Sequence, residues 1–246
     1  KKVLNSIKVY SQMNKDHFVE RTTNKGHDTK KFREYVVARF EEIHQNIECA
    51  HKEPNAYYLA EGLLLQQDVD GPVVECGCFK GGMSAKFSVI CKELGKELHL
   101  IDSFQGLPCE EQHISWRGEE ILFGEGAYKG SFDEVNNNIN DCGEISVCRF
   151  HQGWFEDTIH KINLLPSFVF IDVDIISSAK ICIKHFWPKL QGTRFYTHEA
   201  CLKTYMNEVL NKDWWKQSFN ENVPECIGKV NGYYDAQCLA YLKKEK

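Results

Sequence analysis

The stretch VVECGCFKGGMS, residues 73–84, joins a short apolar run to a glycine-rich turn and then to a helical pattern. The apolar run ends at Glu75, and glycines follow at Gly77, Gly81 and Gly82. An apolar run bounded by glycines predicts a buried strand, and the periodic pattern after it predicts a helix. Glycine adopts backbone angles closed to other residues and lets a ligand approach the main chain. We therefore expect a strand, a turn and a helix here, with a ligand held at the turn.

Segments typical of strands and helices alternate after this turn. Further strands are predicted at residues 97–102, 144–150, 167–174 and 193–199. Helices are predicted at residues 131–143, 154–162, 176–190 and 201–215, and a hairpin is expected within residues 226–244. This alternation predicts a Rossmann-like α/β fold, with a mostly parallel central sheet and helices on both faces.

Residues 1–55 differ from the rest because they are polar and charged. One amphipathic helix is predicted there, at residues 31–47, with apolar side chains near helical spacing. We interpret residues 1–55 as a helical N-terminal cap or lid and residues 56–246 as the main domain.

The composition excludes some classes of protein. The 246 residues carry a net charge of −5 and no long basic run, so nucleic acid is not an expected partner. No apolar run approaches the roughly 20 residues of a membrane span, and the first residues lack a signal-peptide pattern. The eleven cysteines are scattered and form no CxxC pair, which predicts reduced, mostly buried thiols in a cytoplasmic protein.

Asp102 narrows the choice of ligand at the glycine turn. It ends the second predicted strand, where an acidic side chain can accept hydrogen bonds from both hydroxyls of a ribose. The turn lacks the G-x-G-x-x-G spacing of a dinucleotide site. A dinucleotide and S-adenosylmethionine both remain candidates, and the missing pyrophosphate turn favours the second. The alternative role for Asp102 is to cap a turn or a helix.

Five blocks of sequence resemble one family. ECGCFKGGMS, DSFQGLP, GAYKGSFDEVNNNI, HQGWFEDTI and IDVD followed by PKLQG are similar, in order and spacing, to the macrocin O-methyltransferase family. The resemblance covers about residues 57–202. It implies a class I S-adenosylmethionine-dependent methyltransferase that methylates a hydroxyl of a sugar or other small-molecule natural product. It also implies a homo-oligomer, because members of the family form dimers or larger assemblies.

The resemblance also implies which residues surround the cofactor. The glycine turn and the segment from Asp102 to Gly106 lie around it, and Ser131 lies near it. Gly153, Trp154 and Phe155 form its adenine-side wall. Core packing is the alternative role for Trp154 and Phe155. The cofactor-binding residues predicted in this way are Glu75, Gly77, Phe79, Lys80, Gly81, Gly82, Met83, Ser84, Asp102, Ser103, Phe104, Gly106, Ser131, Gly153, Trp154, Phe155 and Asp172.

Acidic residues gather at the ends of two later strands. Asp172 and Asp174 are two residues apart in a strand, so both can face the same side. His198 and Glu199 end the next strand, which lies about 4.8 Å away if the two are neighbours. Such a cluster suits a divalent metal, which lowers the pKa of a bound hydroxyl while a carboxylate removes its proton.

In the family, the first aspartate of D-x-D and a later Asp-Asp pair hold the metal, and the second aspartate is the base. The resemblance therefore implies Asp172, His198 and Glu199 as metal ligands and Asp174 as the base. Here a His-Glu pair replaces Asp-Asp, which favours manganese or iron over magnesium. If no metal binds, His198 becomes a candidate base.

Several alternatives stay open at this point. Within the fold, the rival is a metal-independent methyltransferase acting on nitrogen or another atom. Outside it, the rivals are a nucleotide-binding oxidoreductase and a non-catalytic binding module. The acceptor pocket is expected to involve residues 1–55, residues 110–126 and the C-terminal tail, with Trp116, Phe123 and Tyr128 as candidate aromatic walls.

Overall fold

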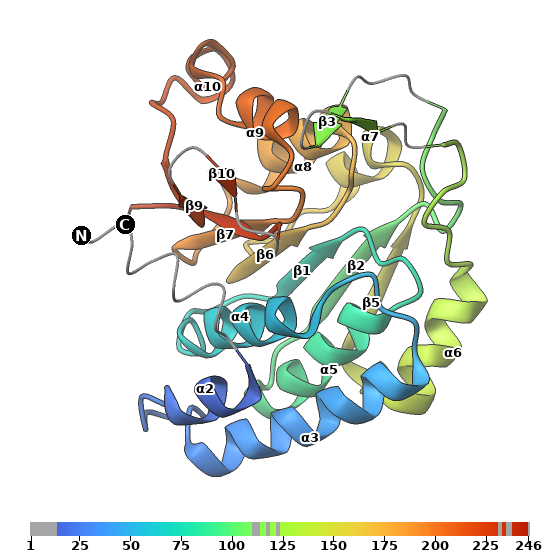
Figure 1. Ribbon diagram of the computed structural model, residues 1–246, viewed down its shortest axis with the longest axis vertical. Helices are drawn as coiled ribbons and strands as arrows, with labels where there is room; N and C mark the ends of the chain where they lie inside the picture. The colour runs from blue at the N-terminus through green and yellow to red at the C-terminus, as the bar shows by residue number, and fades with distance from the viewer. Residues whose placement is uncertain are drawn as a thin grey trace.

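The computed structural model describes residues 14–109, 114–116, 119–121, 124–230, 233–234 and 238–245. Its centre is a seven-stranded sheet in the order β5-β2-β1-β6-β7-β11-β8 (Figure 1). The five strands from β5 to β7 are parallel, and β11 runs antiparallel to both of its neighbours. The strands are β1 Val73–Cys76, β2 Leu98–Asp102, β5 Cys148–Gln152, β6 Phe168–Ile171, β7 Arg194–Thr197, β8 Glu225–Ile227 and β11 Ala240–Lys243. The predicted α/β class is confirmed.

Helices cover both faces of the sheet (Figure 1). They are α2 Lys15–Glu20, α3 Lys30–Asn46, α4 Glu53–Leu64, α5 Gly82–Leu94, α6 Phe132–Cys142, α7 Phe155–Thr158, α8 Ile176–Phe186, α9 Lys203–Val209 and α10 Lys212–Phe219. Two short antiparallel pairs lie outside the sheet, β3 Ile114–Trp116 with β4 Glu119–Ile121, and β9 Lys229–Val230 with β10 Tyr233–Tyr234.

Strand β6 shows how the two layers of core arise. Phe168 and Phe170 pack with side chains of α3, α4 and α5, whereas Val169 and Ile171 pack with those of α8, α9 and α10. Successive side chains of a strand point to opposite faces, so a strand covered on both sides must be apolar throughout. This is why FVFI reads as a continuous apolar run.

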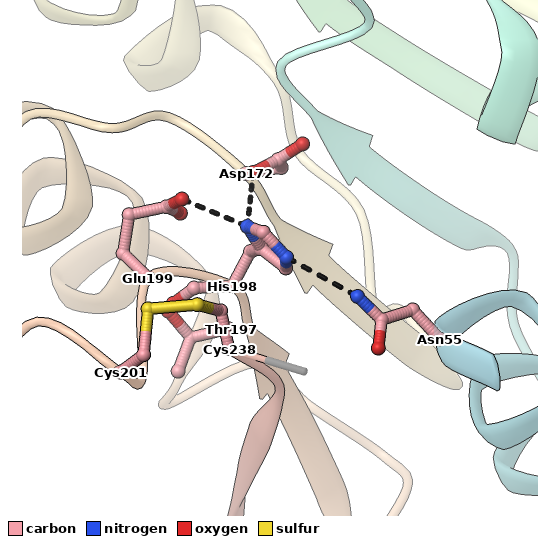
Figure 2. Close-up of a disulfide and its surroundings, with 7 residues drawn as sticks. All are labelled: Asn55, Asp172, Thr197, His198, Glu199, Cys201 and Cys238. Atoms are coloured by element: carbon pink, nitrogen blue, oxygen red, sulfur yellow. Dashed lines mark hydrogen bonds and ion pairs between the residues drawn. A yellow bond between two sulfur atoms is a disulfide. The ribbon is translucent and has the colours of Figure 1, made fainter. Parts of the chain in front are cut away.

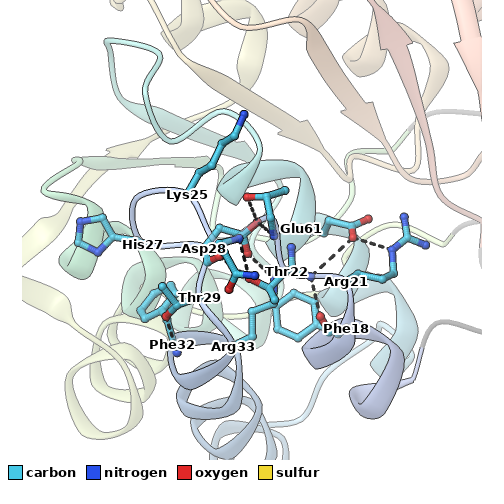
Figure 3. Close-up of polar contacts among 12 residues, drawn as sticks. Phe18, Arg21, Thr22, Lys25, His27, Asp28, Thr29, Phe32, Arg33 and Glu61 are labelled. Atoms are coloured by element: carbon cyan, nitrogen blue, oxygen red, sulfur yellow. Dashed lines mark hydrogen bonds and ion pairs between the residues drawn. The ribbon is translucent and has the colours of Figure 1, made fainter.

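The N-terminal segment is tied to the sheet by both packing and charge. Val36 and Phe40 of α3 belong to the same core layer as α5. The fully buried side chains of Arg33 and Asp28 form an ion pair. Figure 3 shows this pair beside Glu61 of α4, whose carboxylate also accepts a hydrogen bond from Arg21 Nε at 2.8 Å. The boundary between residues 55 and 56 stays a prediction.

Several predicted elements differ in detail from the structure. The strands predicted at residues 167–174 and 193–199 are shorter, because β6 ends at Ile171 and β7 at Thr197. The acidic residues and the histidine predicted at these strand ends therefore lie in the loops that follow.

The helix predicted over residues 201–215 is divided into α9 and α10, because Asn211 caps α10 by accepting a hydrogen bond from Trp214 N. The strand predicted at residues 144–150 begins later, since Ile145–Val147 forms a 3-10 turn before β5. The local sequence pattern does not distinguish a short 3-10 turn from the strand that follows it.

The cysteine prediction is wrong for one pair. Cys201 and Cys238 form a disulfide, while the other nine cysteines are free. Pairing of β7 with β11 brings the two together, and Ala200 N donates a hydrogen bond to Cys238 O at 2.9 Å. Sequence spacing carries no sign of this contact because it depends on which strands pair.

No helix in the described part of the chain is both long and apolar enough to cross a bilayer.

Candidate active site

A pocket opens at the carboxyl ends of β1, β2, β6 and β7, where an α/β sheet normally binds its ligand. It encloses about 960 Å³, including its open mouth. The residues that line it are Ala50, Gly77, Phe79, Asp102, Ser103, Gly106, Leu107, Pro108, Tyr128, Trp154, Phe155, Asp172, Val173, Asp174, Ser178, His198 and Glu199. Tyr128 is thus at the pocket, as expected, whereas the side chains of Trp116 and Phe123 lie outside the described residues.

Gly77 brings the two halves of the pocket together. Its φ is +87°, and a Cβ atom there would lie 1.9 Å from the carbonyl oxygen of Asp172. Only glycine allows the turn after β1 to approach the end of β6 this closely. The cofactor-side turn and the acidic strand end are therefore adjacent because residue 77 has no side chain.

Asp102 holds two turns at once. Its Oδ2 accepts a hydrogen bond from Cys78 N, and its Oδ1 accepts one from Phe104 N, both at 2.7 Å. Burial raises the pKa of Asp102, and these two bonds oppose that shift. The carboxylate caps the turns and also faces the pocket, so the two roles considered for it are compatible in this geometry.

The other predicted cofactor residues divide into three groups. Ser103, Gly106, Trp154 and Phe155 line the pocket with Gly77, Phe79, Asp102 and Asp172. A smaller adjoining cavity, which shares Gly77, Phe79 and Asp172, is also lined by Glu75, Gly82 and Met83. The structure brings the remaining six to neither cavity, and these are Lys80, Gly81, Ser84, Phe104, Ser131 and Gly153.

Three of those six have a visible structural role. Ser131 caps α6 by accepting a hydrogen bond from Glu134 N, and Lys80 pairs with Glu48. Gly153 N donates to Asp102 O at 2.9 Å, which fixes the loop that carries Trp154. Their influence on the pocket is through the positions of neighbouring residues.

The acidic residues predicted for chemistry come together at the other end of the pocket. His198 Nδ1 lies 2.8 Å from Glu199 Oε1 and 3.2 Å from Asp172 Oδ1 (Figure 2). Asp174 lines the same pocket with a positive φ of 56°, and Glu199 has one of 54°. Left-handed backbone at non-glycine residues is uncommon and is found at strained functional sites.

Burial and mutual repulsion shift the acid–base equilibria of this cluster. Burial, with the charges of Glu199 and Asp172, raises the pKa of Asp174 well above its ordinary value. Burial also raises the pKa of Glu199, to about 7. Against the effect of burial, the two imidazoles hold the pKa of Asp172 well below its usual range, and the carboxylates of Glu199 and Asp172 raise that of His198 well above it.

His51 and Asn55 were not predicted as site residues. His51 Nε2 lies 2.9 Å from Asp172 Oδ2, and its ring packs against that of His198 with centroids 4.7 Å apart. Asn55 Nδ2 lies 3.3 Å from His198 Nε2. His51 lies just before α4 and Asn55 in its first turn, both far from Asp172 in sequence, and no motif spacing connects them to it.

This sheet, with a glycine turn after β1, an acidic residue ending β2 and a pocket at the strand ends, defines a class I methyltransferase. The sequence profile of the macrocin O-methyltransferase family, TylF, matches residues 55–199, which is more than half of the chain. The chain belongs to this family. It is an S-adenosylmethionine-dependent O-methyltransferase, and the predictions of fold, cofactor and enzyme class are confirmed.

Solved structures share the fold at low sequence identity. The O-methyltransferase NovP is 19% identical with a TM-score of 0.61, and the alignment covers 100% of this chain and 98% of NovP. The calicheamicin methyltransferase CalS11 is 14% identical with a TM-score of 0.53, covering 90% and 95% of the two chains. TomG from Streptomyces achromogenes is 12% identical with a TM-score of 0.52, covering 85% and 90%. Comparison with curated protein sequences gives no match.

Proposed function

We propose that this enzyme methylates a hydroxyl of a sugar or a glycosylated natural product and that Asp174 is the base. A single observation carries the proposal. One pocket brings the cofactor-side residues Gly77 and Asp102 together with Asp172, Asp174 and His198. A methyl donor and an acceptor hydroxyl can therefore meet in a space closed by main chain on one side and by carboxylates on the other.

The cofactor half of the pocket has the features that a nucleoside requires. The glycine turn permits close approach, Asp102 offers acceptor oxygens, and the aromatic rings of Trp154 and Phe155 supply an apolar wall. We assign the adenosine of S-adenosylmethionine to this half and its methyl group to the side facing Asp174.

The acceptor half contains a carboxyl group that can act as a base. An alcohol is a poor nucleophile at neutral pH, so its proton must leave as the oxygen attacks the methyl carbon. Asp174 lies in the pocket with its pKa raised, which makes it a stronger base than an exposed carboxylate. The oxygen–carbon bond forms while the carbon–sulfur bond breaks, and the electron pair remains on the departing thioether. Without a bound ion, burial lowers the pKa of His198, but the carboxylates of Glu199 and Asp172 raise it well above its ordinary value. The ring then carries a proton that a bound metal ion would displace.

The donor set fits a divalent ion. Within the described part of the chain, His51 Nε2 and Glu199 Oε2 are buried atoms without a hydrogen-bond partner at this cluster. Asp172, His198 and Glu199 would hold such an ion, and the imidazole favours manganese or iron over magnesium. When bound, the ion lowers the pKa of an adjacent hydroxyl.

Relatives suggest the class of acceptor. The family is named for macrocin O-methyltransferase, and CalS11 is described as a TDP-rhamnose 3'-O-methyltransferase from calicheamicin biosynthesis. We therefore place nucleotide-linked deoxysugars and glycosylated natural products first among the acceptors. The pocket wall formed by Leu107, Pro108 and Tyr128 supports an acceptor with an apolar face.

Purified enzyme should be incubated with S-adenosylmethionine and a panel of acceptors: TDP-rhamnose, free rhamnose and an aminated analogue that lacks the reactive hydroxyl. Formation of a methyl ether, located by mass spectrometry and NMR, is the expected result. Transfer to the amine alone would favour the nitrogen-methylating alternative and contradict this proposal.

Binding of the cofactor can be tested without any acceptor. Asp102→Ala should weaken binding of S-adenosylmethionine by about 1–3 kcal/mol, because ribose hydroxyls lose a partner. Calorimetry measures this directly, and Asp141→Ala serves as the control because Asp141 is exposed and lines neither cavity. Equal affinities for Asp102→Ala and the unaltered enzyme would refute the assignment.

Three broader features complete the proposal. Residues 1–55 form a cap that contributes His51 to the site, which is supported by the contact of His51 with Asp172. The enzyme works in the cytoplasm, which is supported by the nine free cysteines, five of them buried. It assembles as a homo-oligomer by analogy with its family, and light scattering showing a mass of 28.5 kDa at high concentration would contradict this.

A further inference from the structure

We propose that His51 is a metal ligand, and that it forms with Asp172 and His198 a site of two imidazoles and one carboxylate for a transition-metal ion. The inference rests on the proposed function, because it concerns the same catalytic cluster. It adds a ligand from a segment outside residues 55–199, the part of the chain that matches the family.

The three ligand atoms have the spacing of a shared ion. One nitrogen or oxygen of each of His51, Asp172 and His198 lies within 4.8 Å of the others. The two closest distances are 2.9 Å, from His51 Nε2 to Asp172 Oδ2, and 3.2 Å, from His198 Nδ1 to Asp172 Oδ1. Metal bonds of about 2.1 Å at right angles place neighbouring ligand atoms about 3 Å apart.

The orientation of the His51 ring favours a shared metal ion over a direct hydrogen bond as the reason for its contact with Asp172. Its Nε2 is buried and makes no hydrogen bond among the described residues, although Asp172 Oδ2 is only 2.9 Å away. A hydrogen bond needs the oxygen near the axis on which the ring nitrogen carries its proton. If a metal ion instead lies on that axis of His51 Nε2, a second ligand of the ion, such as Asp172 Oδ2, lies to one side of the axis. The contact between Nε2 and Oδ2 agrees with this arrangement.

Asn55 can keep His198 in the form that binds a metal. For Nδ1 to bind an ion, the proton must lie on Nε2, which then needs an acceptor. The amide of Asn55 is 3.3 Å from Nε2, and exchanging its oxygen and nitrogen would present that acceptor without moving the side chain. Asn55 is therefore a positioning residue in this proposal.

The ligand types determine the class of ion. Two neutral imidazoles suit iron, manganese, cobalt or zinc, whereas magnesium prefers oxygen ligands and water. Glu199 Oε1 lies 2.8 Å from His198 Nδ1, so its carboxylate is placed to serve as a fourth ligand. The site thus differs from an all-carboxylate magnesium site in charge as well as in ligand type.

The test uses the full chain, freed of metal by chelator, and Mn²⁺ as the probe. Binding is followed by the loss of the free-ion EPR signal, and pulsed EPR then counts the nitrogen nuclei coupled to the bound ion. The unaltered protein should bind about one Mn²⁺ with two coupled nitrogens, and Mg²⁺ in equal amount should not displace it. His51→Gln should retain one coupled nitrogen and bind at least about ten-fold more weakly.

His99→Gln is the matched control, because His99 is equally buried but lies on β2 away from the pocket. It should behave as the unaltered protein does. One coupled nitrogen in the unaltered protein, or no bound ion, would overturn the proposal, and this result does not depend on whether His51→Gln folds.

Neither substrate is present in this experiment, so the two proposals can fail separately. Methyl transfer that survives without Mn²⁺ binding would refute the metal site alone. Binding of Mn²⁺ through two nitrogens, together with no transfer to any hydroxyl, would refute the proposed function alone.

Discussion

Two clusters of charge lie close to α4, and they are built differently. In the N-terminal cluster, the guanidinium groups of Arg21 and Arg33 face the carboxylates of Asp28 and Glu61 (Figure 3). Positive and negative charges are equal in number, and Arg33 also lies over the ring of Phe18 at 4.7 Å. Such a cluster can stabilise the fold but has little capacity for a further ligand.

The catalytic cluster has the opposite character. Three carboxyl groups, of Asp172, Asp174 and Glu199, face two imidazoles and no guanidinium or ammonium group among the residues that line the pocket. Burial, with a smaller contribution from neighbouring carboxylates, raises the pKa values of Asp174 and Glu199. In the structural cluster, positive and negative groups are therefore equal in number. The catalytic cluster, which has to accept protons or cations, has more carboxyl groups than positively charged groups.

The largest expected effect is on catalysis. Asp174→Asn should lower kcat by about 10²–10⁴-fold, because the general base is removed. Asparagine tolerates the positive φ of residue 174, so the backbone should be retained. The free energy of unfolding should stay the same or rise, since a buried carboxyl with a raised pKa is replaced by a neutral group. Exposed Glu156 provides the control, as Glu156→Gln, and unchanged turnover in Asp174→Asn would show that another group is the base.

The next largest effect is on the free energy of unfolding, and it concerns the N-terminal cluster. Asp28→Asn leaves the buried guanidinium of Arg33 without its closest partner and should destabilise the protein by about 3–5 kcal/mol. Urea unfolding followed by circular dichroism measures the difference. Glu20→Gln, which breaks an exposed ion pair with Lys30, should cause no measurable change.

The pH dependence of this difference follows from Asp28. Burial disfavours its charge, but hydrogen bonds from Arg33 and Thr23 hold its pKa below the ordinary value. A depressed pKa contributes stability above the unfolded value of about 3.9, and that contribution is lost as the pH falls through the folded pKa. The difference between Asp28→Asn and the unaltered protein should therefore shrink below about pH 4. A constant difference down to the acid transition would show that packing, and not charge, dominates.

The smallest of these effects concerns the disulfide that lies beside the catalytic cluster (Figure 2). Replacing both Cys201 and Cys238 with serine should lower the free energy of unfolding by about 2–4 kcal/mol, because the unfolded chain is no longer crosslinked. Reductant should have a similar effect on the unaltered protein and none on the double variant. Cys226→Ser is the control, and equal sensitivity of all three proteins to reductant would exclude the disulfide as the cause.

Much of the framework follows from short stretches of sequence. The turn after β1 could be predicted from Gly77, Gly81 and Gly82, and the cap of α6 from Ser131, because main-chain angles and nearby hydrogen bonds decide these features. The alternation of apolar runs with helical patterns was enough to predict the five parallel strands in order, although their ends differ and β5 begins at Cys148 and not at residue 144. Asp172 and Asp174 do line one pocket, but not for the predicted reason: β6 ends at Ile171, and both residues lie in the loop after it, where Asp174 has a positive φ.

The tertiary structure alone decided which side chains complete the site. His51 meets Asp172, Asn55 meets His198, and Cys201 meets Cys238, although nothing in the local pattern relates the members of each pair. These contacts depend on how α4 and the segment just before it pack against the sheet, and on β11 pairing with β7. Local sequence determines backbone conformation through interactions that span a few residues. Burial of apolar faces depends on the whole chain, and that burial brings distant polar groups close enough to share a proton or an ion.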